Sequence, residues 1–232
     1  MTGQILENEE VRARQSGGTS SNAIYAMALN ALRKRLAGGT GRLLDIGCGT
    51  GAFQAAVREL GPGYVAEYVG VDIAQYAGFP KGAGFQQADL NQPTWPIEDG
   101  VAEVTVSLET IEHVENPRAF FREIVRITKP GGFVLVSTPN QLTWLSLLTL
   151  IVKSQYNAFQ ERQGQYPSHL SALLEIDLLR MAREMGLTEV EVVYSGQGRM
   201  PGVRYHWPRW LSRDRRRFSD NLALLGRRAA GN

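Results

Sequence analysis

Apolar and polar residues alternate along the chain in two different periods. Short apolar runs rich in β-branched residues are separated by stretches in which apolar residues recur at helical spacing, notably 52–60 and 117–127. Strands that alternate with helices in this way predict a parallel sheet covered by helices on both faces. The runs that predict strands are RLLDI (42–46), YVGVD (68–72), AEVTVSL (102–108), FVLVS (133–137), EVEVVY (189–194) and NLALLGR (221–227).

The pattern changes towards both ends of the chain. Residues 1–19 are polar and interrupted by glycine, so we expect a mobile N-terminal segment or one that folds over a bound ligand. Ser20–Asn22 can cap a predicted helix that stops at Gly38–Gly39. Beyond Pro139, the apolar run 142–152 is only about half as long as the ~20 residues that span a bilayer. It therefore predicts a buried or interfacial helix.

Length and composition indicate one domain. At 232 residues and 43% hydrophobic content, the chain can bury one sizeable core. We predict a single domain over residues 20–232, with variable lid segments at 141–170 and 195–218. An excess of two positive charges is too small to indicate a DNA-binding protein. The single cysteine, Cys48, and the lack of a signal-peptide pattern favour a cytoplasmic location. The oligomeric state stays open.

The stretch LLDIGCGTGAF joins the first predicted strand to a helix through a glycine-rich turn. Gly47, Gly49 and Ala52 satisfy the G-x-G-x-x-G/A spacing, and Asp72 ends the next strand, so a nicotinamide dinucleotide fits formally. The carboxylate of Asp45 would repel a pyrophosphate at the mouth of this turn. It would attract S-adenosylmethionine, which carries an ammonium and a sulfonium and no phosphate. Asp72 can accept hydrogen bonds from the ribose hydroxyls of either ligand.

Five segments in the same order resemble class I S-adenosylmethionine-dependent methyltransferases, in particular the group with the ubiquinone-biosynthesis O-methyltransferases. The segments are LLDIGCGTG, VGVDIA, ADLNQP, LETIEHVENP and EIVRITKPGGFVLVSTPN, and they cover about residues 40–140. The resemblance implies a Rossmann-like α/β fold with a mostly parallel seven-stranded sheet and an antiparallel last strand. It also implies S-adenosyl-L-homocysteine as a product. The cofactor-binding residues that the motifs and the resemblance imply are Asp45, Gly47, Gly49, Gly51, Asp72, Ile73, Asp89, Leu90 and Leu108.

An acidic cluster follows the strand predicted at 102–108. If the chain becomes helical there, Glu109, Glu112 and His113 share one face. The E-x-x-E-H pattern resembles that of quinone-pathway O-methyltransferases that hold a divalent magnesium, whereas a solvated helix start is the alternative. We expect His113 to act as general base together with Glu112. His169, in the first variable segment, is a second candidate for the base.

The acceptor site is expected in the variable segments, because the cofactor half has no pocket for a second substrate. The arginines from Arg199 to Arg217 alternate with aromatic residues and suggest peripheral contact with anionic lipid or phosphate; a solvated basic connector is the alternative. The preferred function is O-methylation of a small molecule: a quinone precursor, a natural product or a glycan. Methylation of RNA or protein, a non-catalytic S-adenosylmethionine-binding subunit and a dehydrogenase are the other readings.

Overall fold

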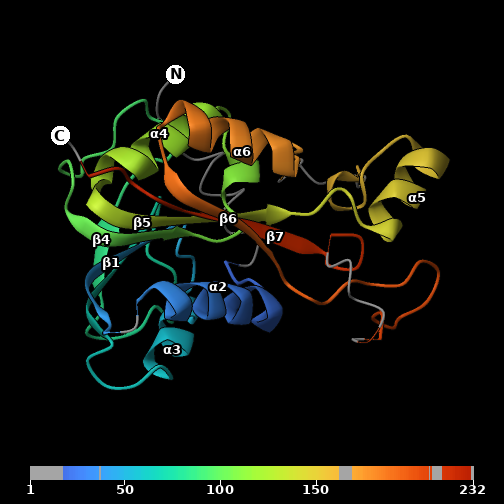
Figure 1. Ribbon diagram of the computed structural model, residues 1–232. Helices are drawn as coiled ribbons and strands as arrows, with labels where there is room; N and C mark the ends of the chain where they lie inside the picture. Colours follow the sequence, from blue (N-terminus) through green and yellow to red (C-terminus); the bar gives the residue numbers. More distant parts are fainter. Residues whose placement is uncertain (1–17, 37, 162–168, 209, 211–215, 231–232) are drawn as a thin grey trace.

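The central sheet has the predicted seven strands. The computed structural model describes residues 18–36, 38–161, 169–208, 210 and 216–230 (Figure 1). Strand order is β3-β2-β1-β4-β5-β7-β6, and only β7 runs antiparallel to its neighbours. This confirms the expected fold. The strands are β1 (Thr40–Ile46), β2 (Val65–Asp72), β3 (Gly84–Gln87), β4 (Ala102–Ser107), β5 (Thr128–Pro139), β6 (Thr188–Tyr194) and β7 (Asn221–Arg227).

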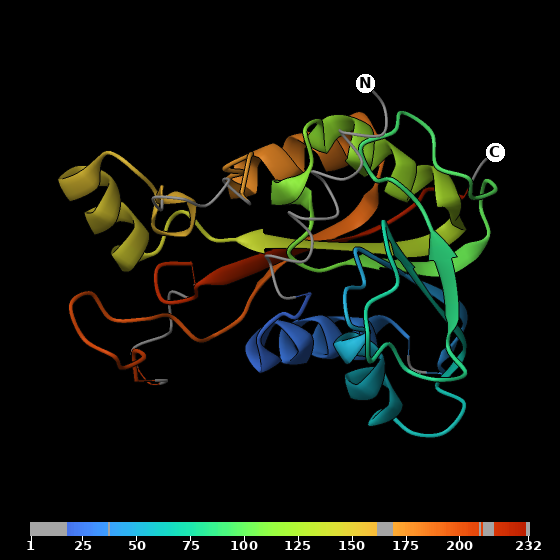
Figure 2. The ribbon, with the colours of Figure 1, turned by 180° about the vertical axis from the view of Figure 1, so that it is seen from behind.

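Helices cover both faces of the sheet, as the alternating pattern predicts (Figures 1 and 2). Alternate residues of a strand point to opposite faces, and in β1 Leu44 packs with α4 and α6 whereas Leu43 packs with α2 and α3. The sheet therefore separates two apolar cores. Among the described residues, the helices are α2 (Asn22–Arg35), α3 (Ala52–Arg58), α4 (Pro117–Ile127), α5 (Trp144–Lys153) and α6 (Glu175–Glu184), and the short 3-10 helices are η1 (Ile111–His113) and η2 (Asn157–Phe159).

Helix starts differ in how they are capped. In α4 the Asn116 side chain accepts a hydrogen bond from the backbone N–H of Ala119, and Pro117 occupies the first helical position. The first helix is not capped as predicted. Ser21 is the N-cap residue of α2, but its side chain makes no capping hydrogen bond, and the helix ends at Arg35, before Gly38–Gly39.

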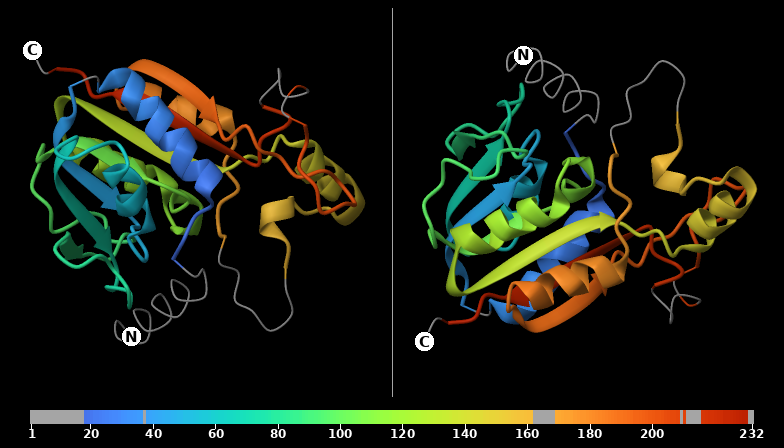
Figure 3. Two further views of the ribbon diagram at one scale, coloured as in Figure 1. Left: turned by 90° about the horizontal axis from the view of Figure 1, so that it is seen from below. Right: turned by 90° about the horizontal axis from the view of Figure 1, so that it is seen from above.

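Helix α5 lies apart from the two cores. It follows β5 and projects beyond the carboxyl end of the sheet, next to the segment around residues 199–208 (Figures 1 and 3). The apolar run thus forms a helix close to the predicted range, but Ser146 is its only fully buried residue. Within the described residues, no helix combines the length and apolar character needed to cross a membrane.

Replacing Ile124 by alanine tests the core beneath α4. Ile124 is completely buried among the side chains of the sheet, so Ile124→Ala should lower the free energy of unfolding by about 3 kcal/mol. Arg122 lies on the exposed side of the same helix, and Arg122→Ala should change it by less than about 0.5 kcal/mol. Urea unfolding measures both values. Equal decreases in the free energy of unfolding for the two variants would contradict the orientation of α4, with Ile124 in the core and Arg122 at the surface.

Candidate active site

The candidate site lies at the carboxyl edge of the sheet, where the strand order reverses. β1 pairs with β2 on one side and with β4 on the other, so the loops after β1 and β4 leave the sheet towards opposite faces. Open α/β sheets bind ligands in the crevice that forms at such a point. The glycine-rich turn, the end of β2 and the acidic segment after β4 all meet here.

The glycine-rich turn needs glycine for both conformation and space. Gly47, Gly49 and Gly51 have φ angles of 74°, 50° and 74°, which disfavour other residues. A Cβ atom on Gly47 would lie 2.2 Å from Oγ1 of Thr110, which follows β4. The backbone of Gly18 packs equally closely against Gly49. The turn is therefore closely packed between Thr110, in the loop after β4, and Gly18.

Gly18 brings the N-terminal segment to the glycine-rich turn. Its carbonyl oxygen accepts hydrogen bonds from the backbone N–H of Thr50, at 2.9 Å, and from the Thr50 hydroxyl, at 3.2 Å. The expectation that this segment is mobile or folds over a ligand stays a prediction. Residues 1–17 of the predicted mobile segment lie outside the described residues.

Asp72 joins the end of β2 to the same turn. One carboxylate oxygen accepts a hydrogen bond of 2.8 Å from the backbone N–H of Gly49, and the other accepts one of 2.7 Å from that of Ile73. The residue is only 8% exposed, and burial raises the pKa of its carboxyl group while the two backbone donors oppose the shift. Each oxygen keeps a lone pair with which it can accept a further hydrogen bond.

Asp45 is buried at the end of β1 and already has a protein partner. Its carboxylate accepts a hydrogen bond from the hydroxyl of Tyr68 on β2. Desolvation by burial raises the pKa of Asp45 to about 7, and the charge of Asp72 adds to the shift. The sequence did not indicate that Tyr68 is the partner of Asp45, because tyrosine is a common residue in strands. The expected contact between Asp45 and a cationic ligand stays a prediction.

The other three predicted cofactor contacts surround the same edge. The carboxylate of Asp89 holds a tight turn by accepting hydrogen bonds from the Asn91 backbone N–H, at 2.9 Å, and from Nε2 of Gln92, at 2.7 Å. Leu90 is partly buried against the core under α4. Leu108 is buried against the core under α2. Their contacts with a cofactor stay predictions.

The acidic segment after β4 is not the helix that its spacing suggested. Glu109 has a φ angle of 55°, and η1 begins only at Ile111, so Glu109 does not share a helical face with Glu112 and His113. The Glu109 carboxylate accepts hydrogen bonds from the Ser137 hydroxyl, at 2.8 Å, and from Nδ2 of Asn221, at 2.6 Å. Burial raises its pKa to about 7.

Glu112 is the acidic residue of this segment that is buried without hydrogen-bond partners among the described residues. It is fully buried, and neither carboxylate oxygen has a hydrogen-bond partner of good geometry among the described residues. The buried hydroxyl of Thr138 also lacks such a partner, and it lies close enough to Glu112 to lower the pKa of this carboxyl group somewhat. Burial raises the pKa of Glu112 well above its usual value, and the charge of Glu109 raises it further. Buried polar groups without partners are rare and concentrate at functional sites.

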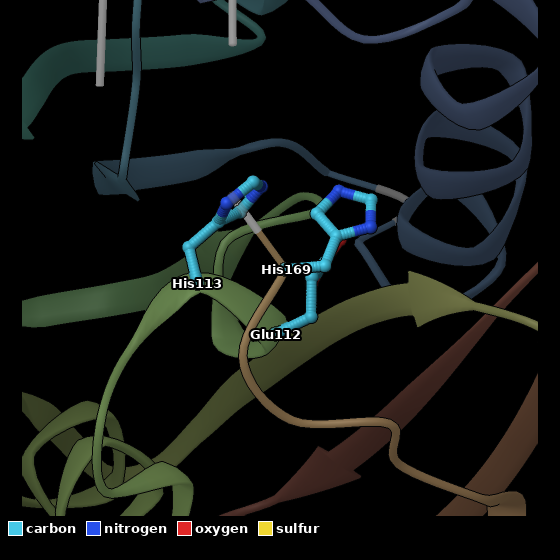
Figure 4. Close-up of side chains that lie close together, drawn as sticks. All are labelled: Glu112, His113 and His169. Carbon is cyan, nitrogen blue, oxygen red and sulfur yellow. The ribbon is translucent and has the colours of Figure 1, made fainter. Parts of the chain in front are cut away.

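Two histidines complete the cluster (Figure 4). Potential ligand atoms of Glu112, His113 and His169 all lie within 4.8 Å of one another. The two imidazole rings meet edge to face, with their centroids 4.7 Å apart. Nδ1 of His169 lies 2.7 Å from the carbonyl oxygen of Ala158, so Nδ1 carries the proton in the neutral ring and Nε2 is the acceptor. Burial lowers the pKa of His169 and favours that neutral form.

Backbone contacts fix the segment that carries His169. The carbonyl oxygen of Glu112 accepts hydrogen bonds from the N–H groups of Leu170, at 2.7 Å, and Ser171, at 3.0 Å. The pairing of His169 with Glu112 was not predicted, because no local pattern links residues so far apart. A better signal existed for Ser137 and Thr138, which are polar residues at the end of an otherwise apolar strand.

The two variable segments are described only in part. Residues 162–168 of the first and 211–215 of the second lie outside the described residues, as does Arg209. Two of the described arginines bind the body of the domain: Arg199 pairs with Asp220 at 2.6 Å, and Arg216 pairs with Glu175 at 2.7 Å. The predicted contact of the arginines with lipid or phosphate stays a prediction.

Comparison with known proteins identifies the family. The model of the methyltransferase domain family matches residues 21–192. The chain belongs to this family. It is 28% identical over 173 residues to a ubiquinone biosynthesis O-methyltransferase of Burkholderia pseudomallei, across 71% of this chain and 68% of that protein. It is 33% identical over 131 residues to the mitochondrial ubiquinone biosynthesis O-methyltransferase of Dictyostelium discoideum, across 49% of this chain and 40% of that relative's length.

A solved structure supports the same assignment at the level of the fold. An S-adenosylmethionine-dependent methyltransferase from Archaeoglobus fulgidus matches with a TM-score of 0.58 and 16% identity, over 86% of this chain and 93% of that one. The family match makes this chain a methyltransferase, and the solved structure shows that it has the fold of an S-adenosylmethionine-dependent methyltransferase.

Alanine at Gly47 tests the packing of the glycine-rich turn. Gly47→Ala should abolish binding of S-adenosylhomocysteine, because the new Cβ would overlap Thr110. Gly63 is a matched control: it has a similar φ of 77° and open space around it, so Gly63→Ala should cost only about 1–2 kcal/mol of backbone strain and leave binding unchanged. Calorimetric titration with S-adenosylhomocysteine measures the binding. Equal affinities for the two variants would contradict the described packing.

The raised pKa of Asp45 predicts a pH-dependent stability. An aspartate has a pKa of about 3.9 in the unfolded chain and about 7 here. Asp45 therefore contributes its largest stabilisation, on the order of a few kcal/mol, below about pH 4. This contribution is lost as the pH rises through about 7. In the Asp45→Asn variant, the side-chain oxygen of the asparagine can still accept the hydrogen bond from Tyr68, but position 45 no longer titrates. Between these pH values the free energy of unfolding of the unmodified protein should fall relative to the variant. Parallel urea-unfolding profiles would contradict the assigned burial.

Proposed function

We propose that this methyltransferase moves the methyl group of S-adenosylmethionine to a hydroxyl oxygen of a small molecule: a quinone precursor, a natural product or a glycan. The observation that carries the proposal is the cluster of the buried Glu112 with the partly buried His113 and His169 beside the glycine-rich turn, with the charge of Glu109 acting on Glu112. An oxygen acceptor has to lose a proton, and this cluster provides groups that can take it. The names of the two O-methyltransferase relatives support the same reaction.

The residues at the carboxyl edge suit a cationic ligand without phosphate. The turn from Leu43 to Phe53 and the segment 70–76 contain no lysine or arginine, and they bring the carboxyl groups of Asp45 and Asp72 together. We infer that Asp72 accepts hydrogen bonds from the ribose hydroxyls and that the glycine-rich turn packs against the methionine part. Asp89, Leu90 and Leu108 would surround the adenine. Bound S-adenosylmethionine supplies the electrophilic methyl group.

His113 is proposed as the general base. It is partly exposed next to Glu112, so an acceptor hydroxyl can reach its imidazole. Taking up the proton would create a positive charge next to the buried Glu112, and that charge would favour the ionised form of Glu112 despite its raised pKa. Most of the acceleration would come from holding the acceptor oxygen in line with the methyl group and from excluding water.

A divalent magnesium at Glu109, Glu112 and His113 stays a prediction. The Glu109 oxygens are bound to Ser137 and Asn221, whereas both Glu112 oxygens lack such partners among the described residues. If a cation binds, Glu112 is its first carboxylate ligand. The converging atoms comprise two imidazoles and one carboxylate, a set that suits transition metals better than magnesium, which prefers oxygen ligands.

Substitution of His113 tests the proposed base. His113→Ala should lower kcat about 10²–10⁴-fold and leave the Kd for S-adenosylhomocysteine within about twofold, because the residue is expected to act on the acceptor. Glu115 is an exposed neighbour in the same loop, and Glu115→Ala should keep full activity. Transfer of labelled methyl to catechol-bearing quinone precursors measures turnover, and mass spectrometry of the product identifies the methylated atom. Unmodified turnover in His113→Ala, or methylation at nitrogen or carbon, would overturn the proposal.

A further inference from the structure

The exposed side of α5 is apolar, the reverse of an ordinary surface helix. Trp144 and Leu148 are each 47% exposed, Ile151 is 79% exposed and Val152 is 71% exposed. Their spacing of four, three and one residues places them on one side of the helix, whereas the only fully buried residue of α5 is Ser146. Exposure of aliphatic side chains to this extent costs free energy that a partner surface would recover.

A second segment extends this apolar surface. Val203 is 50% exposed, Tyr205 is 73% exposed and Trp210 is 77% exposed. An open apolar groove of about 360 Å³ lies between this segment and α5 and is lined by Trp144, Leu148, Pro201, Trp207 and Phe218. We call α5, residues 198–208, Trp210 and residues 216–218 together the apolar tip. Figure 3 shows its two parts side by side at one end of the molecule.

The residues of the apolar tip have a net positive charge. The tip contains no aspartate or glutamate, although the whole chain has an excess of just two positive charges. The Arg217 guanidinium lies over the Trp144 ring, 5.5 Å from its centroid, so charge and aromatic surface are in direct contact. Tryptophan and tyrosine beside basic residues are typical of surfaces at the boundary between lipid and water. Its basic residues are Lys153, Arg199, Arg204, Arg216 and Arg217. Arg199 and Arg216 form ion pairs with Asp220 and Glu175 of the domain body, so Lys153, Arg204 and Arg217 carry the net positive charge of the tip.

We propose that the apolar tip docks onto the surface of an anionic lipid bilayer. Ile151, Val152 and Val203 would enter the boundary between headgroups and acyl chains. The side chains of Lys153, Arg204 and Arg217 would contact the phosphates. A second copy of the chain fits less well, because a symmetric contact would place Lys153, Arg204 and Arg217 of both copies against each other, and the tip contains no acidic residue to pair with them. A nucleic acid would use the charges but leave the aliphatic side chains in water.

Docking would orient the active site. α5 follows the carboxyl end of β5, which is parallel to β4 and so ends at the same edge of the sheet as the acidic cluster. The apolar tip and the catalytic edge therefore lie at the same end of the sheet (Figure 2). This inference does not depend on the identity of the acceptor, because it rests on the surface of the tip alone.

Vesicle co-sedimentation of the full chain tests the proposal. The probes are vesicles of equal parts phosphatidylglycerol and phosphatidylcholine, compared with vesicles of phosphatidylcholine alone. Binding to the anionic vesicles should exceed binding to the neutral ones, and it should fall at least about tenfold when the NaCl concentration rises from about 50 mM to about 500 mM.

Two matched pairs of variants separate the apolar and the charged contributions. Ile151→Ser should weaken binding about fivefold and Arg204→Glu about tenfold or more. Val190 lies on β6 and is 36% exposed, and Arg122 lies on the exposed side of α4. Val190→Ser and Arg122→Glu should therefore bind like the unmodified protein. If Ile151→Ser lowers the Tm more than Val190→Ser does, Val152→Ser replaces it.

Several results would overturn the proposal. These are no binding to anionic vesicles, equal binding to both kinds of vesicle, or equal effects of the tip variants and their controls. A change of oligomeric mass in Ile151→Ser, measured by sedimentation, with unchanged vesicle binding would instead assign the surface to a second copy of the chain. Methyl-transfer activity does not enter these measurements, so their failure leaves the proposed reaction intact.

Discussion

The hydrogen bonds of Asp72 are the constraint on which the active-site edge depends. Its carboxylate binds the backbone N–H groups of Gly49 and Ile73 and so fixes the turn after β1 to the end of β2. Gly47, in the same turn, is packed against Thr110 from the loop after β4. Three loops from adjacent strands are thereby held in one arrangement, and the acidic cluster is positioned relative to the glycine-rich turn.

The acidic cluster is costly to bury, and only part of that cost is offset inside the protein. Glu109 is satisfied by Ser137 and Asn221, whereas Glu112 lacks hydrogen-bond partners of good geometry among the described residues and has a raised pKa. Acids with strongly shifted pKa values cluster at catalytic sites, where a substrate, proton or cation completes the arrangement. A ring nitrogen of His169, which burial keeps neutral, lies within 4.8 Å of a carboxyl oxygen of Glu112.

The periodic part of the fold could be predicted from sequence, because burial on both faces leaves a readable apolar pattern in strands such as β1, β4 and β5. Strand β3 left no such pattern, since GFQQ lies at the sheet edge and is only partly buried. The glycine-rich turn and Asp72 were readable because local spacing defines them. The geometry after β4 could not be predicted in this way, because Glu109 adopts a left-handed conformation that interrupts the expected helix. His169 joins the cluster through contacts that exist only in the folded chain. The exposure of α5 likewise depends on which surfaces the other helices already cover.

The central claim is that the edge formed by Asp45, the glycine-rich turn and Asp72 receives a cationic adenosyl ligand without phosphate. Parallel calorimetric titrations of the unmodified protein with S-adenosylmethionine and with NAD test this claim most directly, since the two ligands share an adenosine and differ in charge and in the pyrophosphate. We expect binding heat with S-adenosylmethionine and none with NAD at the same concentrations. Tight binding of NAD, with no heat from S-adenosylmethionine, would contradict it.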